Sequence, residues 1–61
     1  MTIPERLEAA RELVDRAESL VEAIPEIGSI DSEIDDALRY LGLAYDSLGY
    51  ALDDWNEQNP A

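Results

Sequence analysis

The feature that most limits the fold of this chain is a four-three spacing of apolar residues that occurs twice. The apolar positions of the first half are Ile3, Leu7, Ala10, Val14, Ala17, Val21 and Ile24. Those of the second half are Ile34, Leu38, Leu41, Tyr45, Leu48, Leu52 and Trp55. This spacing gathers the side chains of each half into one seam along a helix. The sequence therefore predicts two helices with one apolar seam each.

The two seams are separated by the segment Pro25-Glu26-Ile27-Gly28-Ser29-Ile30. Proline disfavours a helical residue before it and cannot donate to the helical ladder, so the first helix should stop there. A loop of this length suits a tight antiparallel connection. We therefore predict an all-α, coiled-coil-like two-helix antiparallel hairpin in one domain, residues 1–61, with helices over about 3–24 and 31–56 and a loop over 25–30.

The two helix starts carry capping signals. Thr2 and Glu5 have the spacing of a capping box, in which each side chain bonds the backbone of the other residue. The second helix opens near Asp31 or Ser32, and either side chain can cap it. In the loop, we expect Ile27 and Ile30 to fold back over the end of the core.

The length of the chain predicts an assembly. A 61-residue chain buries only about 60% of the surface that its unfolded form exposes, so a small domain usually needs a disulfide, a metal or a partner. The chain has no Cys and no His, so disulfides, thiolate metal sites and imidazole metal ligands are excluded. Of these sources of stability, oligomerisation remains. No apolar run approaches the roughly 20 residues of a membrane span, and we expect a cytoplasmic protein without membrane contact.

Small residues flank the seam of the second helix. Ala37, Ala44 and Ala51 lie on one side of it, and Gly42 and Gly49 lie on the other. A glycine inside a helix costs about 1 kcal/mol relative to alanine. Two glycines seven residues apart therefore suggest that another backbone or a bulky side chain comes close to them.

A second apolar stripe runs along the opposite side of the second helix. Tyr40, Leu43 and Tyr50 follow the helical spacing there, and the first helix can cover only one side of the second. We therefore predict a homodimeric four-helix bundle in which the second helix lies between neighbours. The predicted interface for self-association or for a partner comprises Tyr40, Leu43, Tyr50, Gly42 and Gly49.

Catalytic chemistry finds no support in the sequence. There is no His, Cys or Lys for acid-base or nucleophilic work and no Gly-rich phosphate loop. The segment that begins at Asp31 starts like a calcium loop, but its sixth position is Asp36 and its twelfth is Gly42, where a calcium loop needs Gly and Glu. We predict no enzyme, no cofactor and no metal site.

The charge of the chain is strongly negative: 15 Asp and Glu against 4 Arg give a net charge of −11. Direct nucleic-acid binding is therefore disfavoured, whereas a basic protein surface is a plausible partner. One set of carboxylates recurs every three or four residues, about 5 Å apart along a helix: Glu5, Glu8, Glu12, Asp15, Glu18, Glu22 and Glu26. This spacing is comparable to that of DNA phosphates, although Arg6, Arg11 and Arg16 interrupt it.

Two hypotheses for function follow. The first is a small, acidic, non-catalytic protein–protein interaction module that self-associates through its second helix. The alternative is an acidic nucleic-acid mimic of the phage or mobile-element type, which inhibits a DNA- or RNA-handling protein through the carboxylate row. Adaptation to high salt, or simple solubility, explains the same acidity without a dedicated function.

Overall fold

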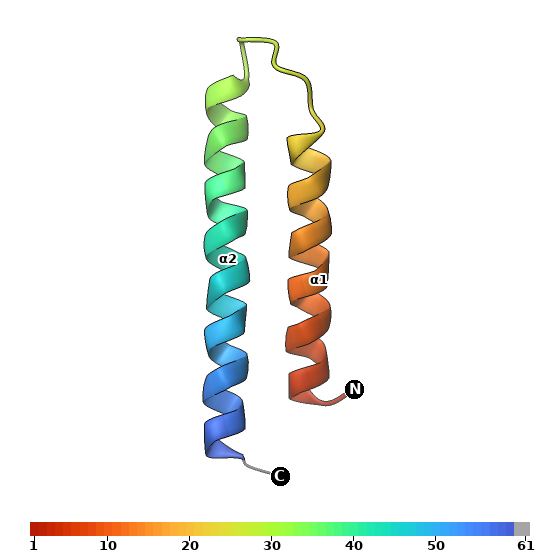
Figure 1. Cartoon of the computed structure of the whole chain (residues 1–61), viewed down its shortest axis with the longest axis vertical. Helices are drawn as coiled ribbons and strands as arrows, with labels where there is room; N and C mark the ends of the chain where they lie inside the picture. The colour runs from red at the N-terminus through yellow and green to blue at the C-terminus, as the bar shows by residue number, and fades with distance from the viewer. Residues whose placement is uncertain (60–61) are drawn as a thin grey trace.

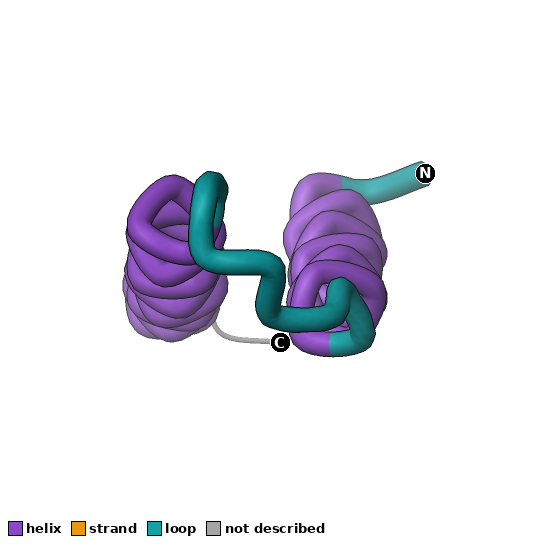
Figure 2. Tube along the Cα trace, turned by 90° about the horizontal axis from the view of Figure 1, so that it is seen from above, coloured by secondary structure: helices purple, strands orange, loops and turns teal. Residues whose placement is uncertain are grey.

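The chain forms an antiparallel helical hairpin. A computed structural model describes residues 1–59, in which α1 (Ile3–Glu22) and α2 (Asp31–Gln58) pack along each other and no strand occurs. The two helices run side by side and are joined by one loop at the top of Figure 1. The hairpin measures 49 × 17 × 10 Å. Seen along the helices, the two rods form a single layer (Figure 2). The predicted all-α hairpin is confirmed.

The start of α1 is fixed by the predicted capping box. The hydroxyl Oγ1 of Thr2 accepts a hydrogen bond from the backbone N–H of Glu5, and the backbone N–H of Thr2 donates to Oε1 of Glu5, both at 3.2 Å. The Thr2 backbone N–H, and next its side chain, hold the pKa of the Glu5 carboxyl below its ordinary value. Two otherwise unpaired backbone donors of the first turn are thereby satisfied.

The end of α1 comes two residues earlier than predicted. The helix stops at Glu22, and Ala23 closes it by donating its backbone N–H to the carbonyl of Ser19 at 3.1 Å. Pro25 restricts the backbone of the residue before it, Ile24, to non-helical conformations. The helix ends two residues before Ile24, and the connecting segment is residues 23–30.

The start of α2 differs from the prediction. Its N-cap residue is Ile30, which makes no side-chain capping bond, so neither Asp31 nor Ser32 caps the helix. The carboxylate of Asp31 turns back to the loop instead: Oδ1 accepts from the N–H of Ile27 and Oδ2 from the N–H of Gly28, both at 3.1 Å. Gly28 has a φ of +79°, which a residue with a Cβ adopts only with strain. Asp31 therefore holds the turn.

The expectation that the loop isoleucines close the core is wrong. Ile27 is 61% exposed and Ile30 is 38% exposed. Because the bonds to Asp31 fix the backbone of the turn at the start of α2, these side chains stay at the surface. The loop end of the hairpin is left open.

Candidate interaction surfaces

The contact between the two helices is a strip without a fully buried residue. The predicted seam positions are half-buried from Leu7 to Val21 in α1 and from Ile34 to Trp55 in α2, while Ile3 and Ile24 at the two ends of the first seam are exposed. Within residues 1–59 no side chain is buried. Two helices can bury each other's side chains only along their line of contact. Each seam side chain therefore remains exposed to solvent on one side.

The side chain of Arg11 covers one side of this seam. The guanidinium of Arg11 lies 4.3 Å from the centre of the Tyr45 ring, a cation–π geometry. A Cβ placed on Gly49 would stand 3.2 Å from Nη2 of Arg11, and one on Gly42 would stand 4.0 Å from Oε1 of Glu18. Gly42 and Gly49 are half-buried. The bulky groups that approach the two glycines here come from α1 of the same chain.

These contacts define the two broad faces of the hairpin. In α1, residues 11 and 18 lie on one side of the seam and residues 13 and 20 on the other, by the 100° turn per residue. In α2, Gly42 and Gly49 lie on one side and the alanines on the other. Because Arg11 meets Gly49 and Glu18 approaches Gly42, these four residues share one broad face, here called the glycine face.

The opposite broad face is apolar and open. It carries Leu13, which is 64% exposed, and Leu20, which is 73% exposed. Over the middle of this face, residues 10–20 of α1 and 37–51 of α2, these helix positions are alanine or leucine: Ala10, Leu13, Ala17, Leu20, Ala37, Leu41, Ala44, Leu48 and Ala51. We call this set the leucine face. Arg6, seven residues before Leu13, and Trp55, seven residues after Leu48, continue the same rows. Leu13 and Leu20 are not among the interface residues predicted from the sequence, because in the sequence they only extend the seam of the first helix on one side.

The five predicted interface residues do not form one surface. Tyr40, Leu43 and Tyr50 are 64%, 56% and 69% exposed, and we call this set the tyrosine stripe. Gly42 and Gly49 lie instead beside α1, on the glycine face. The tyrosine stripe points away from α1, so the hairpin has open apolar surface both on α2 alone and across α1 and α2.

The predicted row of carboxylates is mostly exposed but is not one straight line. Glu5, Glu8, Glu12, Asp15 and Glu22 are exposed on α1, whereas Glu18 is half-buried beside Gly42. Glu26 lies in the loop because α1 ends at Glu22. Arg11, one of the three arginines that interrupt the row in sequence, reaches toward Tyr45 of α2. The only ion pair of the described residues joins Arg39 and Asp36 at 3.8 Å.

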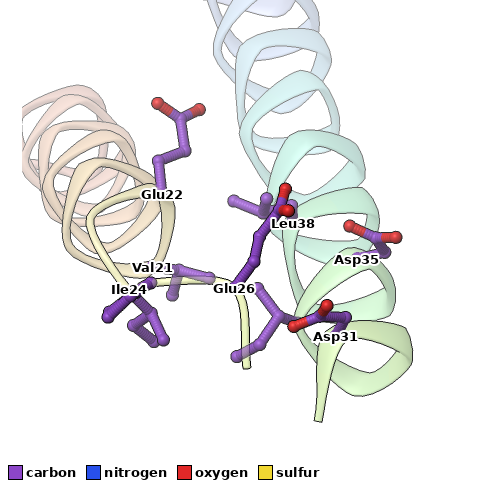
Figure 3. A pocket seen from close by; sticks show the side chains of 9 residues that line it. Val21, Glu22, Ile24, Glu26, Asp31, Asp35 and Leu38 are labelled. Atoms are coloured by element: carbon purple, nitrogen blue, oxygen red, sulfur yellow. The ribbon is translucent and has the colours of Figure 1, made fainter. Parts of the chain in front are cut away.

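A hollow of about 310 Å³ lies at the loop end, between the last turn of α1 and the first turns of α2. Its lining includes the apolar side chains of Val21, Ile24 and Leu38 and four acidic residues, Glu22, Glu26, Asp31 and Asp35 (Figure 3). One of these carboxylates, Asp31, is already engaged by the two loop N–H groups.

Among the described residues, no three carboxylates are placed to hold a metal ion together. In the same part of the chain, neither helix has the length of apolar sequence that crossing a bilayer requires.

Comparison with known proteins gives no relative from which a role could be transferred. No protein-family model, no curated protein and no solved structure matches the chain.

Proposed function

We propose that this chain is a small, acidic, non-catalytic protein–protein interaction module that assembles with a second copy into a four-helix bundle. One observation carries the proposal: within residues 1–59 no side chain is buried, while large apolar side chains stand open on both helices. A stable domain needs apolar burial to offset the conformational entropy that folding removes. An isolated hairpin of this kind supplies little of it, and a second layer of helices supplies the rest.

The absence of catalytic side chains agrees with an interaction role. The chain has no His, Cys or Lys, and its carboxylates lie mainly on solvated helix faces. A bundle with apolar contacts inside and carboxylates outside stays soluble through its charge. The tyrosine stripe is the part of α2 that we propose for contact with a copy or with a further partner, because open aromatic surface of this kind usually marks an interaction site.

Self-association is tested by the mass and the melting behaviour of the purified chain. Light scattering at micromolar concentration should give about twice the 6.8 kDa chain mass, and the melting temperature should rise with concentration, because assembly stabilises the folded state by mass action. A folded monomer whose melting temperature does not depend on concentration would contradict the proposal.

A second candidate function is mimicry of nucleic-acid phosphates by the carboxylates of α1. One observation favours it: Arg11 packs over Tyr45 of α2, so the exposed row from Glu5 to Asp15 is less interrupted than the sequence alone suggests. Two observations argue against mimicry along the whole carboxylate row: Glu18 is half-buried, and Glu26 lies in the loop. The partner would be the basic groove of a DNA- or RNA-handling protein, which the chain would block.

Mimicry is tested by salt and by charge reversal. A triple change of Glu8, Asp15 and Glu22 to Lys should abolish binding to such a groove while the hairpin still folds, because all three side chains are exposed. The wild-type interaction should weaken steeply with salt and compete with DNA or RNA. Triple replacement by Gln is the matched control for lost charge without reversal. Binding that persists in half-molar salt after the reversal would exclude mimicry.

A further inference from the structure

The surface area of the hairpin matches one half of a dimer. Folded monomers follow a size relation by which a 6.8 kDa chain exposes about 3,950 Å². This chain exposes 4799 Å². The excess is about 850 Å², close to the roughly 800 Å² that each partner contributes to a standard protein–protein interface. One partner of the size of this chain, covering one broad face, would remove it.

The charges select the face. The glycine face carries Glu18 beside Arg11, whose guanidinium packs over Tyr45, and it is bordered in α2 by Asp35, Asp46 and Asp53, so two glycine faces in contact would bring these carboxylates together. The leucine face presents only alanine and leucine over its middle, Arg6 continues the row of Leu13 and Leu20, and Arg16 and Glu33 lie at its outer edges. A second copy can therefore cover the leucine face while the carboxylates of both copies point outward. Any other acidic surface would meet the same repulsion on the glycine face.

The register between α1 and α2 places Leu13 and Leu20 of α1 at the same heights as the gaps between the alanines of α2. Arg11 lies opposite Gly49 and Glu18 opposite Gly42, so Leu13 is level with Ser47 and Leu20 with Tyr40. Ser47 stands midway between Ala44 and Ala51, and Tyr40 stands midway between Ala37 and Ala44. The leucines of one helix and the gaps between the alanines of the other therefore occur at the same heights.

A twofold axis parallel to the helices uses this register. Such an axis moves α1 of one copy over α2 of the other and leaves every residue at its own height. Leu13 of the second copy then falls between Ala44 and Ala51, and its Leu20 falls between Ala37 and Ala44, as knobs fall into holes. Every pair of adjacent helices is antiparallel, as in an up-and-down bundle.

We infer that a second copy of this chain seats on the leucine face, with α1 of each copy packed across the alanines of α2 of the other. This inference rests on the proposed function and specifies its contact. Leu43 and Tyr50 point away from the contact and stay available to a further partner.

Paired substitutions test the face. Leu20→Glu should weaken dimerisation in sedimentation equilibrium at least about tenfold, because it places a charge in an apolar contact. Leu43→Glu, the matched control on the tyrosine stripe, should leave the dimer unchanged. Ala44→Leu tests the same face with a good helix former that fills the gap for the partner's leucines, and it should also weaken the dimer. A wild-type dimer that Leu43→Glu disrupts, while Leu20→Glu and Ala44→Leu do not, would overturn the inference and leave the proposed function standing. A folded wild-type monomer would overturn both.

A distance between the two loops tests the arrangement. The chain has no Cys, so Ser29→Cys gives one site for a spin label in the loop. With the axis parallel to the helices, both loops lie at one end of the bundle, and the labels should be within about 25 Å, from helix packing distances of 8–10 Å plus the label arms. A leucine-face dimer with α1 over α1 would place the loops at opposite ends of a body 49 Å long. A distance near that length would overturn the α1-over-α2 packing.

Discussion

The guanidinium of Arg11 in α1 lies over the ring of Tyr45 in α2, 4.3 Å from its centre. The same group covers Gly49, one turn further along α2. The Nε of Arg11 is enclosed and has no hydrogen-bond partner among the described residues. Arg11 therefore contributes to the hairpin mainly through packing and the cation–π contact.

We expect Arg11 and Tyr45 to be energetically coupled. In a double-mutant cycle of Arg11→Ala and Tyr45→Ala, chemical denaturation should give a coupling free energy of about 1 kcal/mol. Tyr45→Phe should cost little, because the ring keeps its face. If the two alanine substitutions are strictly additive, the contact does not stabilise the hairpin.

The two glycines should respond differently to substitution. At Gly42 the nearest outside atom to an added Cβ is 4.0 Å away, so Gly42→Ala should raise stability by up to about 1 kcal/mol through helix propensity. Gly49→Ala should gain less, since Arg11 must move aside from 3.2 Å. The comparison of the two melting temperatures checks this. Equal gains would mean that Arg11 yields without cost.

A larger residue at Gly49 should destabilise the protein. Gly49→Leu would displace the guanidinium from Tyr45, and overpacking of this kind costs about 1–3 kcal/mol. Its melting temperature should fall below that of Gly49→Ala. A rise above the alanine variant would show that the glycine face is open to solvent at this point.

The capping box should make the start of α1 sensitive to acid. Because the pKa of Glu5 is lower in the folded state than its ordinary value of 4.5, its contribution is present above that value and is lost as the pH falls through the folded-state pKa. The protection of the first-turn amides of α1, measured as their hydrogen-exchange rates relative to those of an unstructured chain at the same pH, should therefore decrease at low pH. Glu5→Gln should remove this local dependence, and Thr2→Ala should cost about 1 kcal/mol. Unchanged acid sensitivity in Glu5→Gln would assign the effect to other carboxylates.

The turn should depend on Asp31. Asp31→Ala removes both acceptors of the Ile27 and Gly28 N–H groups and should cost about 1 kcal/mol or more. Asp31→Asn keeps one carbonyl oxygen and should cost less. Ser32→Ala, at the neighbouring position, serves as the control and should have little effect, because α2 has no side-chain capping bond. A larger loss for Ser32→Ala than for Asp31→Ala would contradict this role of Asp31.

Much of the hairpin follows from the sequence alone, because its determinants are local. The four-three spacing, Pro25 and the Thr2–Glu5 pair specify two helices, a break between them and the start of the first, and each depends on residues within a few positions of one another. The exposure of Tyr40, Leu43 and Tyr50 also follows, since one neighbouring helix can cover only one side of α2.

Only the tertiary structure shows how the sides of α1 and α2 are paired across the helix contact. Periodicity tells which residues share one side of a helix, but not which side of α1 meets which side of α2, because that depends on the path of the loop and on the register. The contact of Arg11 with Gly49 settles both. It assigns the glycines to α1 of the same chain and thereby joins Leu13 and Leu20 with the alanines on the opposite face. The role of Asp31 and the exposure of Ile27 depend likewise on the three-dimensional course of the turn, which no spacing along the sequence encodes.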